Sequence, residues 1–309
     1  MQPKRRAFCL ASLAALAACA ADRVPARPAS LAGRAWDVAA RRFVKTAEAR
    51  ARIAAATVAL LGETHDNRTH HEIQRSILAE ALRMGRRPAL AMEQIDLEWQ
   101  ADVDRAIANG ASPAQIGVAA HATRGWDWPA YSPMVALAMS NRLPVVALNL
   151  PRERTRRIVG EGLDALGPGE ATRLALTATW NPQRNARLRR EIVQGHCGDD
   201  SPIVDKLVDV QRAKDAVMAD RILEASARGV VAILGRGHAR RDLGVPLYLA
   251  ARAPALQVLS LGLVEIDPQA HGVEDYPEAR RGRFDLLWFT EAARREDPCL
   301  AFKGVPVPR

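Results

Sequence analysis

The sequence lacks several features that would place it quickly in a known class. After the first residues, no stretch approaches the roughly 20 consecutive apolar residues of a membrane-spanning helix. No G-x-S-x-G elbow or phosphate-binding loop is present, which argues against serine hydrolases and P-loop nucleotide hydrolases. No module combines basic with aromatic residues, so we expect no nucleic acid partner. The length of 309 residues and the hydrophobic content of 48% suit one large α/β domain or two small ones.

The N-terminus reads as an export signal of a bacterial cell-envelope protein. Lys4, Arg5 and Arg6 precede a short apolar run, which predicts a signal peptide over residues 1–18. The segment 16–19 reads Leu-Ala-Ala-Cys and resembles a lipobox, which predicts that Cys19 is lipidated and anchors the protein to a membrane. Residues 19–33 then form a tether and residues 34–309 the α/β domain. Ala20 after the cysteine favours the outer membrane, facing the periplasm.

Cysteine is scarce, with four residues in the chain. Cys9 would leave with the signal and Cys19 would be acylated, which leaves Cys197 and Cys299 in an oxidising compartment. We expect these two to form a disulfide that closes a loop of about 100 residues and contributes at most about 5 kcal/mol. The alternative is a pair of free thiols or metal ligands.

The charge is basic but dispersed. Removal of the signal peptide lowers the formal net charge from +9 to +6, and acids are interspersed among the many arginines. This pattern is typical of a solvated surface, and it also suits attraction of anionic ligands or lipid headgroups.

One motif occurs twice, each time after a short apolar run. Residues 58–61 lead into Gly62-Glu63-Thr64-His65, and residues 231–234 lead into Gly235-Arg236-Gly237-His238. A third apolar run, residues 89–92, ends in Glu93. Each run predicts a buried strand that delivers ionisable side chains to its carboxyl end.

The order of the elements predicts an α/β fold with a mainly parallel central sheet, helices on both faces and a helical insertion over residues 152–228. Further strands are expected at 145–148, 257–264 and 284–289, and helices at 97–109 and from Ser112, Ser132 and Leu243. In parallel sheets, ligands bind beyond the carboxyl ends of the strands. That edge would gather Glu63, His65, Glu93, Asn149 and His238.

Two helices carry polar residues on faces that should be buried. Asn67 is the expected N-cap of the helix after the first motif, and His70 falls on the inward face of its first turn. Gln211 and Asp215 interrupt the apolar stripe of a later helix. Because buried polar groups require hydrogen bonds, these two either orient the site or satisfy the backbone of a neighbouring strand.

The gathered residues allow two chemistries that spacing cannot separate. His65, His238 and Glu63 suit a divalent metal with open positions. The set Glu63, His65, Glu93 and His238 suits metal-free acid–base hydrolysis equally well, with one histidine as the base. Three aromatics within six residues, Trp126, Trp128 and Tyr131, form either a packing cluster or a platform for a planar ligand.

These motifs resemble the ChaN-type haem-binding uptake lipoproteins, in the superfamily that includes Tiki, TraB and the erythromycin esterases. The residues that carry the likeness are 62–67 with His70, His71 and Gln74, then 91–94, 196–198, 211–219, 235–240, 244–246 and 297–299. The resemblance covers nearly all of the mature chain.

The resemblance implies a lipid-anchored protein that binds haem for iron uptake. It also implies a homodimer closing over the haem, an outer-membrane haem or iron receptor as partner, and tyrosinate as iron ligand. Tyr131 beside two tryptophans is the first choice of ligand, with His70, His71, Arg236 and Tyr248 as further haem contacts. In hydrolytic branches of the superfamily the paired motifs form an active centre, so a metal-assisted or His/Glu hydrolase is the alternative function.

Overall fold

The computed structural model describes residues 30–296 and Cys299. The predicted signal peptide, the lipidation site Cys19 and residues 20–29 of the tether lie outside the described residues. Within the described part of the chain, no helix has both the length and the apolar character needed to cross a membrane.

One mainly parallel sheet of eight strands forms the centre of the described chain, as the sequence predicts. The strand order is β2-β1-β8-β7-β3-β6-β4-β5. The strands are β1 (Ala35–Asp37), β2 (Arg42–Val44), β3 (Val58–Glu63), β4 (Ala89–Asp96), β5 (Val145–Asn149), β6 (Val230–Gly235), β7 (Val258–Glu265) and β8 (Leu286–Thr290). The six strands from β8 to β5 run parallel, whereas β1 pairs antiparallel with both β2 and β8.

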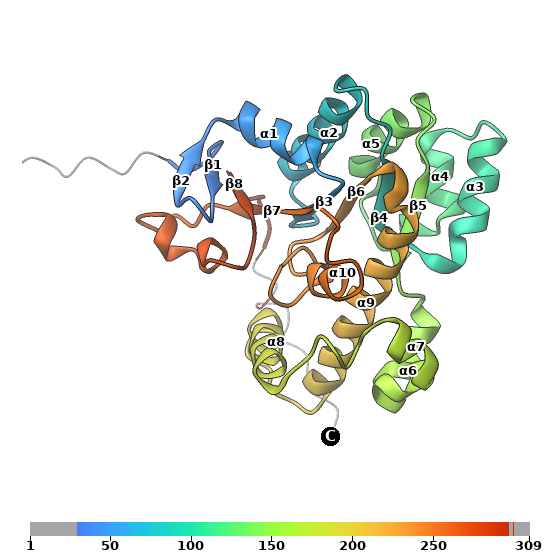
Figure 1. Ribbon diagram of the computed structural model, residues 1–309, viewed down its shortest axis with the longest axis vertical. Coiled ribbons are helices and arrows are strands. Elements are labelled where there is room, and N and C mark those ends of the chain that lie inside the picture. The colour runs from blue at the N-terminus through green and yellow to red at the C-terminus, as the bar shows by residue number, and fades with distance from the viewer. Residues whose placement is uncertain (1–29, 297–298, 300–309) are drawn as a thin grey trace, which may run out of the picture. The chain divides into compact units, whose positions relative to one another are not determined.

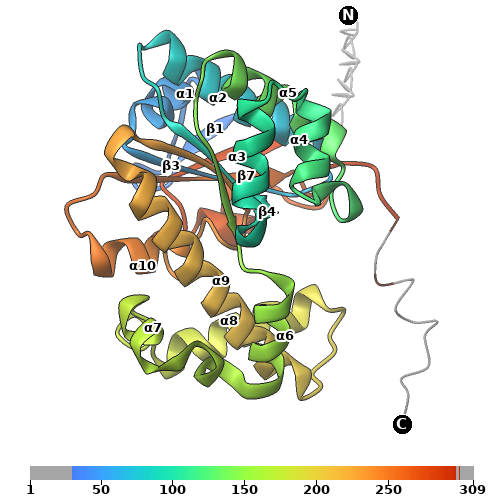
Figure 2. The ribbon, with the colours of Figure 1, turned by 90° about the vertical axis from the view of Figure 1, so that its right-hand side faces the viewer.

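Strand β3 is buried on both faces because its side chains alternate between two apolar cores. Ala59 and Leu61 belong to the core beneath α1 (Thr46–Ala55), α2 (Arg68–Arg83) and α5 (Trp128–Ser140). Val58 and Leu60 belong to the core beneath α9 (Ile203–Ala225) and α10 (Val245–Arg252). Figures 1 and 2 show these two groups of helices on opposite faces of the sheet. Burial on both faces explains why the strand reads as a continuous apolar run.

The predicted helical insertion follows β5. It contains α6 (Arg152–Glu161), α7 (Gly167–Arg173), α8 (Pro182–Gly195) and α9, and Figure 2 shows the first three around α9 on the side away from the sheet. A small third core of Leu188, Val208 and Leu243 joins α8, α9 and the loop after β6. The Sγ atoms of Cys197 and Cys299 lie 2.13 Å apart, so the segment after α8 is joined to the end of the chain by a disulfide.

The starts of three helices test the capping predictions. The Asn67 side chain accepts hydrogen bonds from the N–H groups of Thr69 and His70, as expected of an N-cap. Ser112 starts α4 (Pro113–Ala119), which follows α3 (Gln100–Ala108). The predicted start at Ser132 is wrong: α5 begins at Trp128, because Trp128 and Tyr131 are buried in the core and pack as part of its first turn.

Candidate functional site

The two G-x-x-H motifs meet because β3 and β6 are adjacent parallel strands, with Glu63 opposite Gly235. The lack of a side chain matters at both motifs, most strictly at Gly62. A Cβ atom on Gly62 would lie 2.7 Å from the Cβ of Ala239 and 2.9 Å from the Cα of Arg236. A Cβ atom on Gly235 would lie 3.1 Å from the His65 ring. The glycines therefore let the second loop close against the first and leave space for the imidazole.

Glu63 is the centre of the first half of the site. Its Oε1 atom accepts hydrogen bonds from the Tyr131 hydroxyl at 2.6 Å and the Gln94 amide at 3.1 Å, and it lies 2.9 Å from Nδ1 of His65. The His71 ring lies 3.4 Å from the other carboxylate oxygen. Burial raises the pKa of Glu63, but His65 and His71 outweigh burial and hold that pKa below its ordinary value. Glu63 is thus a buried, fixed carboxylate.

His65 is the member of this half that reaches solvent, with 43% of its side chain exposed. Burial alone would lower its pKa, yet the hydrogen bond with Glu63 raises it. The ring packs edge-on against Trp126, with centroids 4.8 Å apart. Because Nδ1 is held by Glu63, the other ring nitrogen, Nε2, is the one that can act as a base or a ligand.

The second half of the site is a histidine between two carboxylates. Nδ1 of His238 lies 2.6 Å from Asp215, and Nε2 lies 3.3 Å from Glu93. Glu93 also accepts a hydrogen bond of 2.6 Å from the Gly235 N–H. The Gln211 amide nitrogen lies 3.1 and 3.2 Å from the two ring nitrogens of His238. Of the two roles left open for Gln211 and Asp215, orientation of the site is therefore the one observed.

The charges in this half are set by burial and by the pairing. Burial would lower the pKa of His238, but Glu93 and Asp215 raise it to about 10. Burial raises the pKa of Asp215, whereas His238 and the Gly235 N–H lower that of Glu93. His238 is consequently an imidazolium near neutral pH and is unsuited to act as a base. Of the two motif histidines, His65 is therefore the one whose ring could act as a base.

Several residues predicted as haem contacts lie inside the protein. Tyr131 and Tyr248 are 0% exposed, and burial raises the pKa of each well above its ordinary value. A phenolate on Tyr131 would also face the ionised Glu63 at 2.6 Å. This geometry argues against Tyr131 as an iron ligand, because the ligand would have to lose a proton in a buried site beside a carboxylate.

The two adjacent histidines of α2 are also buried. His70 accepts a hydrogen bond from the Thr64 N–H and contacts the Thr290 hydroxyl, each at 2.9 Å, and burial lowers its pKa to about 4. It therefore ties the ends of β3 and β8 together as a neutral ring. His71 lies against Glu63 and Tyr131. Neither ring has the exposure that a haem contact needs, so their predicted role has no support in the geometry.

The prediction of a divalent metal also lacks support. Among residues 30–296 and Cys299, no group of three histidine, cysteine, aspartate or glutamate side chains is arranged to hold a metal ion. The physical reason is that His238 is engaged on both nitrogens. On Glu63, Oε1 is engaged by His65, Gln94 and Tyr131, and Oε2 lies 3.4 Å from the buried ring of His71.

A cavity of about 520 Å³ adjoins the buried carboxylates on the side of β4 and β5. Trp99 and His121 form part of its wall and stack with their rings 3.7 Å apart at 16°. Trp126, which contacts His65, lines the same cavity. Its cationic residues are Arg124, Arg152, Arg156 and Lys214. Sequence reasoning missed Trp99 and His121, which are separated by 22 positions and become neighbours only through the packing of α3 and α4.

Residues 49–249, about two thirds of the chain, match the model of the family described as haem-binding uptake, Tiki superfamily, ChaN. The chain belongs to this family. The match includes both G-x-x-H motifs, Glu93 and Asp215. A search of curated proteins found no match.

The comparison with solved structures found matches of low sequence identity. Campylobacter jejuni ChaN, in a structure of cofacial heme binding, has a TM-score of 0.63 and 20% identity over 82% of this chain and 95% of that one. The type III effector HopBA1 has a TM-score of 0.45 and 12% identity over 80% and 94% of the two chains. A mutant of the erythromycin esterase EreC in its open conformation has a TM-score of 0.39 and 12% identity over 87% of this chain and 86% of that one. The ChaN likeness supports a shared ChaN-type fold.

Proposed function

We propose that this protein binds haem in the cell envelope as part of iron uptake, and that the cavity lined by Trp99, His121 and Trp126 receives the porphyrin. The observation that carries the proposal is the match of residues 49–249 to the ChaN haem-binding family. The chemistry of the cavity agrees with it. Flat aromatic walls suit a planar apolar macrocycle, and neighbouring cations suit its two carboxylates.

The iron ligand within this proposal is His121. Its imidazole is exposed and lines the cavity, whereas all three tyrosines of the chain are buried. His121 also has a φ of +51°, a left-handed conformation that is uncommon for a residue other than glycine. Such backbone strain is more frequent at functional sites than elsewhere. Haem bound here would supply a ferric centre, and this chain would supply an imidazole, aromatic walls and cations for the carboxylates.

Titration of the purified protein with haemin, followed at the Soret band, tests the proposal. We expect a saturable shift that His121→Ala abolishes and Trp99→Ala weakens. The matched control is Tyr131→Phe, which removes the phenol oxygen that the sequence suggests as a ligand while keeping the ring, and it should leave the spectrum unchanged. Absence of a saturable shift in the unsubstituted protein would refute haem binding. A normal spectrum for His121→Ala would refute the choice of ligand, and loss of the band in Tyr131→Phe would point to Tyr131 instead.

The envelope location belongs to the same proposal and rests on the N-terminal sequence. Export with acylation at Cys19 would place the domain at a membrane surface through the tether of residues 19–33. Palmitate labelling in a bacterial host should mark the unsubstituted protein and not Cys19→Ser. A homodimer and an outer-membrane receptor are the proposed partners, and sedimentation with and without haemin tests the dimer.

The second candidate function is acid–base hydrolysis, and the hydrogen-bonded pair of Glu63 and His65 favours it. Glu63 holds Nδ1, so Nε2 of the half-exposed ring is available to remove a proton from water. Because the active form is the neutral ring, the rate should rise with pH through a value above the ordinary pKa of histidine. Hydrolysis of p-nitrophenyl acetate that is lost in His65→Ala would support this function. Equal rates for the two proteins would refute it.

A further inference from the structure

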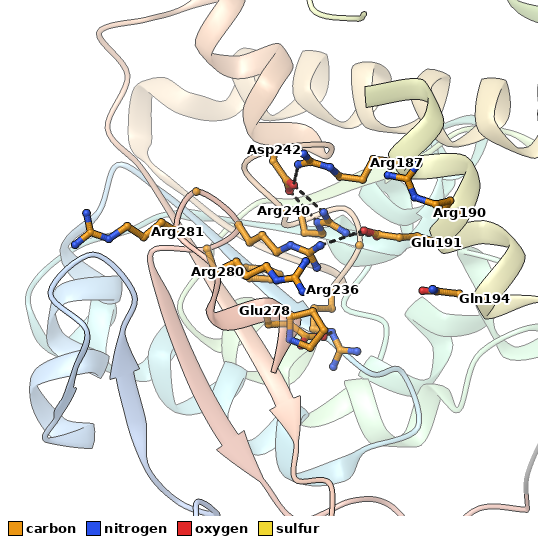
Figure 3. Close-up of a pocket in the computed structure, with 15 residues that line it drawn as sticks. Arg187, Arg190, Glu191, Gln194, Arg236, Arg240, Asp242, Glu278, Arg280 and Arg281 are labelled. Carbon is orange, nitrogen blue, oxygen red and sulfur yellow. Dashed lines mark hydrogen bonds and ion pairs between the residues drawn. The ribbon is translucent and has the colours of Figure 1, made fainter. Parts of the chain in front are cut away.

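A larger cavity, of about 840 Å³, lies on the other side of the second G-x-x-H loop. Side chains from α8, from the loop after β6 and from residues 277–284 meet across it, as Figure 3 shows. It shares no lining residue with the cavity of Trp99 and His121. The two cavities therefore flank the buried site as separate compartments.

The lining of this cavity is strongly basic. Seven arginines face three carboxylates, which leaves a formal charge of +4. The sequence places these arginines far apart, at 187–190, 236–240 and 280–283, which is why they read there as a dispersed, solvated surface. Only the fold brings them to one place.

The carboxylates are already engaged within the cavity wall. Asp242 accepts hydrogen bonds from Arg187 at 2.8 Å and from Arg240 at 2.8 and 2.9 Å. Glu191 is paired with Arg240, and Glu278 lies 3.4 Å from Arg236. Arg240 is 6% exposed and is held from two sides, so the floor of the cavity is preorganised.

Three guanidinium groups in the wall have no anionic partner among the described residues, and of these Arg281 donates to the carbonyl of Ala39. Arg190 of α8 and Arg280 are both exposed, and neither makes an ion pair or side-chain hydrogen bond with any other described residue. Like charges are also crowded at Arg283, whose pKa is lowered by burial and then by the charge of Arg240. Repulsion of this kind is relieved when an anion binds.

The character of the wall identifies the class of ligand. Phe284 is the one aromatic residue among those that line the cavity, so no surface is provided for a planar macrocycle. Planar guanidinium groups match the oxygens of phosphate in bidentate pairs. A net charge of +4 and a volume well beyond that of one phosphate suit a ligand with at least two such groups.

We propose that this cavity is a binding site for a polyanion with two or more phosphate groups, separate from the proposed haem surface. A free diphosphate and the headgroup of a phospholipid such as cardiolipin share this chemistry. Through Arg236 and Gly237 the site is contiguous with the loop that holds His238, so an occupant would lie beside the buried carboxylate cluster.

Isothermal titration of the full protein with inorganic pyrophosphate tests the proposal. The variant is Arg190→Gln with Arg280→Gln, which removes the two unpartnered charges from exposed positions. The matched control is Arg75→Gln with Arg228→Gln, two exposed arginines outside this cavity that make no ion pair or side-chain hydrogen bond with another described residue. We expect saturable binding that the variant weakens about tenfold for each arginine lost, and that the control leaves within about twofold.

Competition by phosphatidylcholine vesicles with and without cardiolipin distinguishes the source of the ligand. Displacement of pyrophosphate by the cardiolipin vesicles alone assigns the site to a lipid headgroup, and lack of displacement assigns it to a soluble polyanion. Absence of saturable pyrophosphate binding, or equal weakening in the variant and the control, would overturn the proposal. Loss of haemin binding in the Arg190 and Arg280 variant would also overturn it, because the cavity would then serve the haem carboxylates.

Discussion

The pairing of His238 with Asp215 predicts a specific pH dependence of stability that Asp215→Asn should reduce. The amide keeps the shape of Asp215 and can still accept the Nδ1 hydrogen bond, but it removes one of the two charges beside His238. The two carboxylates raise the pKa of His238 from 6.5 to about 10, which corresponds to roughly 4–5 kcal/mol at about 1.4 kcal/mol per pKa unit. Loss of one of the two should remove about half of this, roughly 2 kcal/mol.

The sign follows from proton linkage. Between the unfolded pKa of 6.5 and the folded pKa of about 10, the folded protein holds a proton on His238 that the unfolded chain has lost. The stability that this proton provides is complete below pH 6.5 and disappears as the pH rises through 10. In Asp215→Asn the decline should begin at the same pH, because the unfolded pKa of His238 is unchanged, but it should end at a lower pH. The stability difference between the two proteins should therefore fall by roughly 2 kcal/mol between about pH 8 and pH 10.

Urea unfolding of both proteins at several pH values from 7 to 10, without reductant, measures this difference. NMR titration of the His238 ring gives its pKa directly. Asp205→Asn, an exposed aspartate on the same helix, is the matched control and should follow the unsubstituted protein at every pH. The test is the change with pH, and not the difference in free energy of unfolding at any one pH, because the amide also removes the cost of burying the Asp215 charge. A difference that does not change from pH 7 to pH 10, or an unaltered pKa of His238, would refute the pairing.

Three further predictions concern stability. Gly62→Ala should destabilise the protein by about 1–3 kcal/mol, because its Cβ would clash with the second loop. The control is Gly160→Ala, in a helix and without a neighbour within 4 Å, which should be neutral or stabilising by up to about 1 kcal/mol. Urea unfolding measures both changes. Replacing Cys197 and Cys299 by alanine should cost about 2–5 kcal/mol, and addition of reductant should then have no further effect on the unfolding midpoint. The pKa of His70 is lowered to about 4, so the contribution of its neutral ring to the free energy of unfolding is present above pH 6.5 and is lost as the pH falls toward 4. His70→Gln should therefore reduce the dependence of the free energy of unfolding on pH between 6.5 and 4.

The fold class was accessible from the sequence because its signals are local. Residues 58–61, 89–92 and 230–234 are apolar without interruption, as strands buried on both faces must be, and caps such as Asn67 and Ser112 act within a few residues of themselves. The start of α5 was misplaced because the burial of Trp128, a tertiary effect, outweighed the local proline signal at Pro133.

The tertiary structure decided what each polar residue does, since burial and charge pairing depend on segments distant in the chain. The sequence by itself predicted that Glu63, His65, Glu93 and His238 lie at one edge of a parallel sheet. It did not show that Asp215 and Glu93 fix His238 as a cation, that Tyr131 is enclosed, or that arginines 90 positions apart share one cavity. Those properties arise from packing between helices and loops that are distant in the chain, and no periodicity or spacing in the sequence indicates which of them will pack together.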